Sequence, residues 1–288
     1  MAKTKAGKSY LSLTLADKTG QIEAKAWELG IQIQPFEQGD FVKMDADVQT
    51  YGSDLQLRVI RARKSLPGEY EPRDYMPCSD KDPGELWDGV RAMAESVSDP
   101  FLAALLGRVL LTPENEAAFK AHSAGKQMHH AYMGGLAEHT LSVAETCDFL
   151  CGRYAYVNRD LCVTGALLHD IGKLREISPF PENDYTDDGQ LIGHIVMTAI
   201  MIDREASAIE GFPPRLKSLL IHIILSHHGE YAFGSPELPK TIEAMILHVA
   251  DNADAKLKMF ETAYADARGS QWTAYHKTFA RALTKSEW

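Results

Sequence analysis

The spacing of hydrophobic residues changes once along this chain of 288 residues, and the change divides it into two unlike parts. Between residues 8 and 64, apolar and polar residues alternate in short runs separated by turn sequences, which predicts β-strands. From residue 84 onward, apolar residues recur every three or four positions, which predicts helices. We therefore expect a multidomain protein that joins a β domain to an all-α domain.

The β part is expected to be small and the α part large. Strands are predicted at residues 8–15, 22–27, 41–48 and 55–60, and short strands with tight turns favour a small barrel. We assign residues 1–66 to this domain, the proline-rich residues 67–83 to a linker and residues 84–288 to the helical domain. The helices are predicted at residues 84–97, 101–111, 113–122, 134–152, 160–170, 191–209, 213–226, 239–260 and 272–283.

Composition limits where the protein works and what it contacts. No apolar run approaches the roughly 18 residues that a membrane span needs, and no apolar stretch of the signal-peptide type follows the basic N-terminus. We therefore expect a cytoplasmic protein without a membrane partner, and four cysteines with reduced thiols. The net charge of -10 argues against a general nucleic-acid coat protein. The acidity belongs to the C-terminal part, because residues 1–73 carry 11 Lys and Arg against 10 Asp and Glu.

Histidines are concentrated in the helical part, where ten of the eleven lie between His122 and His248. Two pairs stand at the ends of apolar helices, His169 with Asp170 and His227 with His228. A buried histidine and aspartate need compensation for lost hydration, which a cation supplies. Adjacent inward imidazoles pack poorly but are good ligands for a transition metal. We give an ordinary surface or core role to the remaining isolated histidines, His122, His222 and His276.

Three further residues complete a metal-binding pattern. His139 and His194 lie on otherwise apolar predicted helices, and Asp251 interrupts another. Together with the two pairs they offer five imidazoles and two carboxylates, more ligands than one ion takes from a protein. The mixture suits manganese first, with iron or zinc as alternatives. We therefore predict two divalent ions bridged by a carboxylate, which would activate a hydroxide for phosphoester hydrolysis.

The order of these residues resembles that of the HD-domain metal-dependent phosphohydrolases. Longer strings resemble the YhaM-type 3′→5′ exoribonucleases, in which an OB-fold precedes the HD domain. The strings are residues 18–27 (KTGQIEAKAW), 129–139 (HHAYMGGLAEH), 168–173 (LHDIGK), 185–194 (YTDDGQLIGH), 226–230 (SHHGE), 233–236 (FGSP) and 243–256 (EAMILHVADNADAK). The similarity runs over nearly the whole chain.

The resemblance implies roles for individual residues. One metal would be held by His139, His169, Asp170 and Asp251, and the other by Asp170, His194, His227 and His228. Lys173 would face the scissile phosphate, so Asp170 and Lys173 are the predicted catalytic residues. The motif of cyclic-di-GMP phosphodiesterases is absent after His228, and Gly135 replaces the glutamate that would hold a third metal.

The implied activity is release of nucleoside monophosphates from the 3′ end of single-stranded RNA, with DNA as a further substrate. An HD phosphodiesterase for a small cyclic or dinucleotide substrate is the alternative, and a non-catalytic RNA-binding protein with a structural metal is a third hypothesis. The resemblance also implies an OB-like barrel that lacks most of its first strand, because residues 9–15 match the second strand of the family. A homo-oligomer remains open.

Nucleic-acid binding is predicted on the N-terminal domain. Single strands bind OB-folds through stacking rings and positive charges, which the domain offers in Tyr10, Trp27, Tyr51, Arg58, Arg61 and Arg63. The alternative is an ordinary solvated strand edge with core aromatics. In the helical domain, His129 and His130 precede the first ligand helix and either contact the substrate phosphate or pack a loop. The amphipathic residues 272–283 serve domain packing or a partner.

Overall fold

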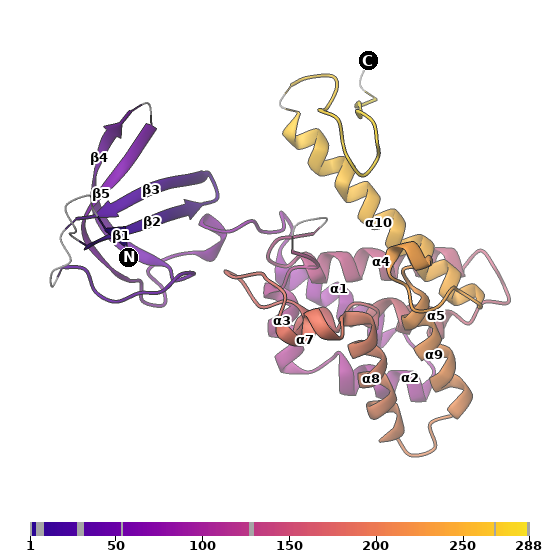
Figure 1. Ribbon diagram of the computed structural model, residues 1–288. Coiled ribbons are helices and arrows are strands. Elements are labelled where there is room, and N and C mark those ends of the chain that lie inside the picture. The colour runs from indigo at the N-terminus through magenta and orange to yellow at the C-terminus, as the bar shows by residue number, and fades with distance from the viewer. Residues whose placement is uncertain are drawn as a thin grey trace. The chain divides into compact units, whose positions relative to one another are not determined.

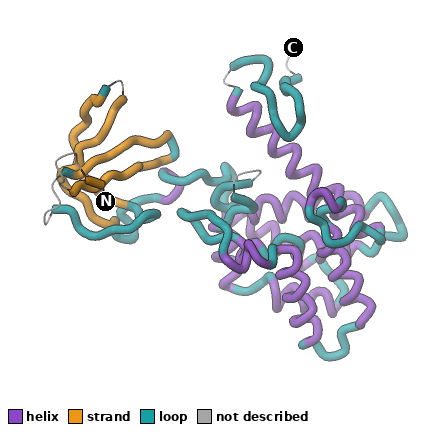
Figure 2. The backbone as a smooth tube through the Cα atoms, in the orientation of Figure 1, coloured by secondary structure: helices purple, strands orange, loops and turns teal. Residues whose placement is uncertain are grey.

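The computed structural model describes residues 2–3, 9–27, 32–52, 54–126, 130–267 and 269–286. The chain divides into two compact units, Met1–Cys78 and Ser79–Trp288. The described strands lie in the first unit and nearly all the helical residues in the second (Figures 1 and 2). The predicted fold class, a β part followed by an all-α part, is therefore confirmed.

The first unit is built on one mixed sheet. Its strands are β1 (Ala2–Lys3), β2 (Ser9–Asp17), β3 (Gly20–Ala26), β4 (Val42–Tyr51) and β5 (Asp54–Lys64), in the order β1-β2-β3-β5-β4. Neighbours pair antiparallel except β3 and β5, which are parallel. The described residues show no pairing between the outer strands β1 and β4, and β1 is two residues long. The sheet is thus open, and its first strand is short, as expected for an OB-like barrel that lacks most of that strand.

Alternation along the strands gives the sheet one apolar face. Ala24 and Ala26 of β3 pack with Val59 and Ala62 of β5, and leucines of β2 complete this small core. Part of the proposed linker also packs on this unit: the rings of Phe41 and Tyr70 stack at 4.0 Å. The first unit therefore extends to Cys78, beyond the boundary at residue 66 that the proline pattern suggests.

The second unit is a helical bundle with a single apolar core. Several of its helices begin at a side-chain cap, because Asp82, Asp99, Thr112 and Thr241 each accept a bond from a first-turn backbone N–H. The helices are α1 (Pro83–Glu95), α2 (Pro100–Val109), α3 (Pro113–Ala121), α4 (Gly135–Cys151), α5 (Arg159–Leu168), α6 (Lys173–Glu176), α7 (Asp187–Leu191), α8 (His194–Ser207), α9 (Pro214–Ser226) and α10 (Ile242–Asp266), with a 3₁₀ turn η2 (Tyr231–Phe233). The 3₁₀ turn η1 (Pro72–Asp74) belongs to the first unit.

Two helix predictions need correction. The helix expected at residues 191–209 begins only at His194, because Gly193 has φ 75° and separates α7 from α8. Residues 272–283 form no helix: Trp272 bridges Thr284 and His276 bridges Arg281 in antiparallel pairing. This segment is rich in β-branched and aromatic residues, whose χ1 freedom a helix restricts. In Figure 1 it folds back alongside the end of α10.

Two expectations from composition can be compared with the structure. Within the described ranges, no helix combines the length and apolar character that crossing a membrane requires. The four cysteines are free thiols, and Cys147, Cys151 and Cys162 are buried in the helical unit. All three belong to the apolar core cluster of this unit.

Candidate metal centre

The fold brings all seven predicted metal ligands to one place in the helical unit. Most stand where a helix begins or ends, because there the chain can turn a polar side chain inward while the helix body stays apolar. The ligands come from α4 (His139), the residues just after α5 (His169 and Asp170), the first position of α8 (His194), the residues just after α9 (His227 and His228) and α10 (Asp251).

Asp170 lies at the centre of this set. Its Oδ2 is 3.3 Å from Nε2 of His169 and 3.4 Å from Nε2 of His139. Its Oδ1 is 3.4 Å from Nε2 of His194 and 3.9 Å from Nε2 of His227. The two oxygens of one carboxylate therefore face two different groups of imidazoles.

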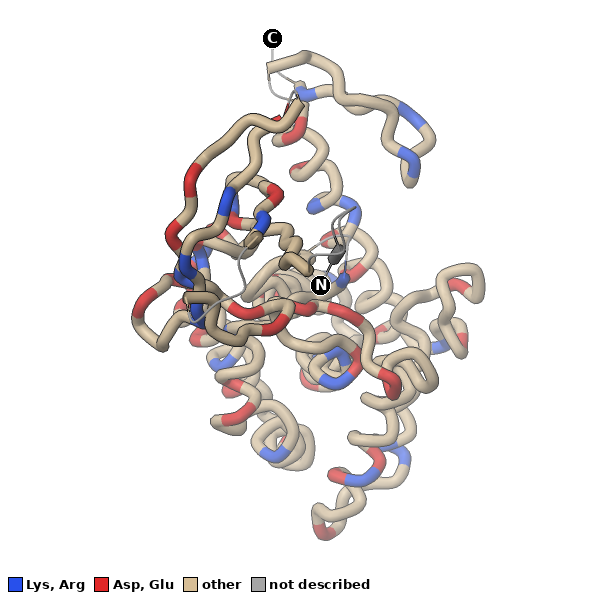
Figure 3. The backbone as a smooth tube through the Cα atoms, turned by 60° about the vertical axis from the view of Figure 1, so that its left-hand side comes forward, with Lys and Arg blue, Asp and Glu red and all other residues tan. Residues whose placement is uncertain are grey.

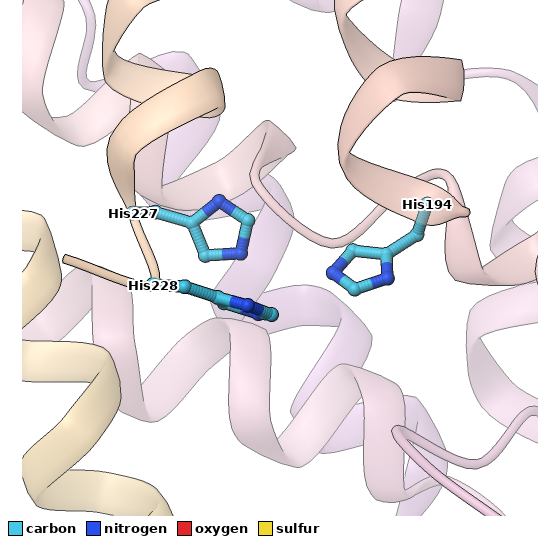
Figure 4. A group of neighbouring side chains, drawn as sticks. All are labelled: His194, His227 and His228. Carbon is cyan, nitrogen blue, oxygen red and sulfur yellow. The ribbon is translucent and has the colours of Figure 1, made fainter. Parts of the chain in front are cut away.

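We name these groups by their first histidine. The His139 group contains His139, His169 and Asp251, whose Oδ1 is 3.2 Å from Nε2 of His139. The His194 group contains His194, His227 and His228, whose candidate ligand atoms all lie within 4.8 Å of one another. Figure 4 shows the ring of His194 facing those of His227 and His228 across a short gap, with His194 on one segment and the histidine pair on another.

Every imidazole of the centre uses its Nδ1 for a hydrogen bond, which leaves Nε2 for a ligand. Three of them donate to backbone carbonyls: His169 to Ala166 at 2.7 Å, His227 to Ile224 at 2.7 Å and His228 to Phe233 at 2.9 Å. For the two histidines that end helices, the acceptor is three residues earlier in the chain. The backbone thus fixes the tautomer that presents Nε2 to the centre.

The other two histidines donate to carboxylates that sequence reasoning missed. His139 Nδ1 is 2.7 Å from Asp254, and His194 Nδ1 is 2.9 Å from Glu176. A carboxylate behind a ligating histidine orients the ring and raises its basicity. The sequence carried a weak signal for both, since Asp254 lies one helical turn after Asp251 and Glu176 lies three residues after Lys173.

The electrostatic environment differs between the two groups. Burial and the neighbouring imidazoles lower the pKa of His227 well below its usual value, and burial also lowers that of His228, which favours the neutral form that binds metals. Burial alone would lower the pKa of His139, but Asp170, Asp251 and Asp254 raise it well above its usual value. The His139 group is therefore the more anionic of the two.

Lys173 lies beside the carboxylate of Asp170. Its Nζ is 2.6 Å from Asp170 Oδ2, and the side chain is nearly buried. Burial would lower the pKa of the Lys173 ammonium, but the charge of Asp170 raises it above its usual value. The same ammonium and the surrounding imidazoles hold the pKa of Asp170 well below its usual value although burial opposes this. The centre thus contains a charged lysine and a charged aspartate.

Buried polar atoms without partners test whether a metal fits. Asp170 Oδ1, His194 Nε2 and His227 Nε2 are all buried and have no hydrogen-bond partner among the residues that the structure describes. Such atoms are costly unless something compensates them, and all three belong to the ligand atoms of the His194 group and its bridge. A divalent cation is a partner of the right charge for nitrogen and carboxylate ligands. The residues present therefore fit a metal site.

The predicted nucleic-acid residues of β2 and β5 alternate with core residues: Tyr10 precedes Leu11, Arg58 lies between Leu57 and Val59, and Arg61 and Arg63 flank Ala62. Because successive side chains of a strand point to opposite faces, these residues lie on the face opposite the apolar core. The rings of Tyr10 and Trp27 stack at 4.7 Å, and the Trp27 side chain is 45% exposed. Tyr51 is 73% exposed, and the Lys25 ammonium lies 5.5 Å from the centre of its ring. Arg58 is exposed and stands opposite Lys25 in the register of β3 and β5. An aromatic and basic surface of this kind is suited to bases and phosphates.

Two of the predicted arginines on this face already have acidic partners. Arg61 forms an ion pair with Asp45. Arg63 contacts both oxygens of Glu69, at 2.6 and 2.7 Å. Figure 3 shows basic and acidic positions interspersed along the strands. Their positive charge is therefore partly neutralised within the sheet unit.

His130 belongs to the helical unit and is buried. Its Nε2 is 2.9 Å from Asp254 and its Nδ1 is 2.8 Å from the hydroxyl of Tyr132. Both ring nitrogens thus have protein partners, which favours the packing role over a phosphate contact. His129 lies outside the described residues. His122 and His222 take ordinary hydrogen bonds with the backbone, as expected.

Comparisons with known proteins agree with this site. The model of the HD domain family matches residues 136–256, a range that contains all seven predicted ligands as well as Glu176 and Asp254. These residues are an HD domain. Among solved structures, the chain is similar to the HD domain of the phosphodiesterase PgpH from L. monocytogenes, with 19% identity over 60% of this chain and 76% of that one, at a TM-score of 0.26.

Proposed function

We propose that this protein is a metal-dependent phosphodiesterase whose active site is the Asp170 centre. The observation that carries the proposal is the placement of the two Asp170 oxygens, each facing a separate group of imidazole Nε2 atoms. One carboxylate between two ligand groups is the arrangement that a two-ion site requires. Manganese is the first candidate for both ions, with iron or zinc as alternatives.

The protein residues have distinct parts in this chemistry. Two bound divalent ions would supply an activated water and would neutralise charge on the phosphate. The Asp170 carboxylate bridges the ligand groups, and the Nδ1 bonds hold each imidazole with Nε2 forward. The Lys173 ammonium lies beside the bridge, where it can stabilise negative charge that develops on the phosphate oxygens.

We further propose that the substrate is single-stranded RNA, with DNA as a second substrate, degraded from the 3′ end to nucleoside monophosphates. The support is the exposed ring-bearing face of the sheet unit, since a single strand binds through stacking on such rings. The sequence motifs that resemble those of YhaM-type exoribonucleases support the same substrate. An enzyme for a small molecule has no need of this face.

A phosphodiesterase for a small cyclic or dinucleotide substrate is the second candidate. The observation that favours it is the pairing of Arg61 and Arg63 with acids, which leaves less free positive charge for a polymer. A non-catalytic RNA-binding protein is the weakest reading, because the full ligand set and the buried Lys173 serve no purpose in it.

One experiment separates these candidates. Full-length protein is incubated with Mn²⁺ and, in separate reactions, with 5′-labelled linear RNA, a circular single strand of the same sequence or a cyclic dinucleotide. We expect a ladder of shortened linear products and an intact circle, with no cleavage by an Asp170→Asn variant. Hydrolysis of cyclic dinucleotides with no action on RNA would support the second candidate, and cutting of the circle would exclude an exonuclease.

A further inference from the structure

A chain of hydrogen bonds extends from the metal centre away from the site of reaction. It begins at His139, whose Nδ1 is 2.7 Å from Asp254 Oδ2. The same oxygen is 2.9 Å from Nε2 of His130, and the other oxygen of Asp254 accepts the Ser142 hydroxyl at 2.5 Å. Asp254 is thus held on three sides before any metal binds.

The segment that carries His130 is itself fixed in place. His130 has φ 54°, an uncommon conformation for a residue with a side chain. Its carbonyl accepts a bond from the backbone N–H of Ala124 at 3.0 Å and lies against Gly135, where a Cβ would come within 2.1 Å of the carbonyl oxygen. Only glycine at position 135 allows this approach. The chain therefore specifies the placement of His130 behind Asp254.

The network continues to a buried carboxylate. The Tyr132 hydroxyl lies 2.8 Å from both His130 Nδ1 and Glu138 Oε2. Glu138 also accepts the Ser79 hydroxyl at 2.7 Å, and the ammonium of Lys258 is 3.4 Å away. The ring of His130 also lies next to that of His139, with ring centres 5.3 Å apart.

We propose that Asp254 is a positioning residue that sets the tautomer and the orientation of His139, and that His130 and Ser142 hold Asp254 for this purpose. The proposal rests on the metal-centre part of the proposed function. It gives His130 the role of supporting a metal ligand in place of the contact with nucleic acid that the sequence suggested. Loss of such an outer partner typically costs about 10–100-fold in metal affinity, and the loss should fall on the ion of the His139 group.

A third ion is the competing explanation, because His130, His139 and Asp254 lie close enough to bind one. Two observations speak against it. Asp254 Oδ2 already lies at hydrogen-bonding distance from both imidazole nitrogens. A glutamate at position 135, which could complete a third site, would collide with the backbone of His130.

The test measures Mn²⁺ binding to the full-length protein by calorimetry and by metal content, without substrate. We expect Asp254→Asn to weaken one ion by about 10–100-fold and to leave the other nearly unchanged. His130→Gln and Ser142→Ala should each weaken the same ion by a smaller factor. His122→Gln is the control, because His122 is equally buried and its ring contacts the carbonyls of Ser123 and Ile177 and, among the described residues, no member of the His139 group. It should leave both affinities unchanged.

Two results would overturn the proposal. One is an Asp254→Asn protein that folds normally and binds both ions as the wild type does. The other is a wild type that binds three ions, the third of which disappears with Asp254 or His130. If Asp254→Asn does not fold, His130→Gln and Ser142→Ala decide, and normal binding in both would refute the proposal. A wild type that binds Mn²⁺ but cleaves no RNA would refute the proposed substrate and leave this inference intact.

Discussion

The metal centre and the outer face of the sheet differ in how they satisfy their polar groups. The centre buries Oδ1 of Asp170 and Nε2 of His194 and His227, and none of these atoms has a hydrogen-bond partner in the described part of the chain. The sheet face exposes Tyr51 and Trp27 and pairs Arg61 and Arg63 with nearby acids. One region leaves polar atoms unpaired inside the protein, whereas the other keeps its charges in water and partly neutralised.

The two regions differ in the free energy that their unpaired or paired polar groups involve. An unsatisfied buried polar atom costs about 1–3 kcal/mol, so three of them in one place require a compensating ligand. Surface ion pairs are each worth about 1 kcal/mol or less, so the sheet face is compatible with several roles. The buried centre therefore calls for a bound cation, whereas the charges of the sheet face call for no particular partner.

The largest effect is expected from Asp170→Asn. The amide keeps the size of the side chain but replaces one ligand oxygen with a nitrogen that cannot bind a cation, so both ions should be weakened. The loss of hydrolysis should exceed the roughly 10–100-fold that an outer partner causes. Metal content and hydrolysis of bis-p-nitrophenyl phosphate measure it, with Asp203→Asn as a surface control. A variant that retains two ions would contradict the proposal that Asp170 binds both of them.

Lys173→Ala should have the next largest effect. Removing one electrostatic donor that acts on developing charge costs about 10²–10³-fold in rate, whereas metal content should stay near that of the wild type. Lys240→Ala is the control, because Lys240 makes an exposed pair with Glu237. A nearly normal rate with normal metal content would show that Lys173 serves only to neutralise Asp170.

The sequence predicted which histidines and aspartates lie together, because these polar side chains stand in or at the ends of apolar helices. A histidine or aspartate at the end of an apolar helix has few explanations, and the structure brings all seven together. The alternation of apolar and polar residues also located the strands, and the recurrence of apolar residues every three or four positions located most helices. These local patterns reflect which residues face a core, so they can be read without knowing the fold.

The remaining features depend on contacts between distant segments. Asp254 and Glu176 stand behind ligands of other helices, and only the fold shows which imidazole each one meets. The apolar spacing in residues 272–283 predicted a helix, but this segment instead pairs with itself in antiparallel fashion, with a bridge between Trp272 and Thr284. The neutralisation of Arg63 by Glu69 likewise requires residues 67–78 to pack on the sheet, which the proline pattern did not indicate.

A smaller effect is expected from Trp27→Ala. Stacking of one base on an aromatic ring is worth about 1–3 kcal/mol, so the affinity for single-stranded RNA should fall between about 5-fold and 150-fold. Hydrolysis of bis-p-nitrophenyl phosphate should not change. Trp272→Ala is the matched control, since Trp272 is similarly exposed in the helical unit. Equal losses of RNA affinity in both variants would remove the special role of the sheet face.

The smallest effect separates the arginines of the sheet face, and salt dependence measures it. Arg58 makes no ion pair with any residue that the structure describes, whereas Arg63 contacts both oxygens of Glu69. A side chain that neutralises one phosphate of a single strand contributes about 0.7 to the slope of log affinity against log salt. Arg58→Gln should therefore lower that slope by about this amount, which corresponds to one phosphate contact.

Arg63→Gln should leave the slope nearly unchanged, because its charge is already used within the protein. It should lower the melting temperature of the sheet unit instead, since Glu69 also anchors the backbone of Leu66 and would lose its main partner. Binding of fluorescent RNA over a range of salt concentrations, with thermal unfolding of the same samples, measures both quantities. Equal slope changes in the two variants would mean that RNA displaces Glu69 from Arg63, and the sheet face would then carry more usable charge than its ion pairs suggest.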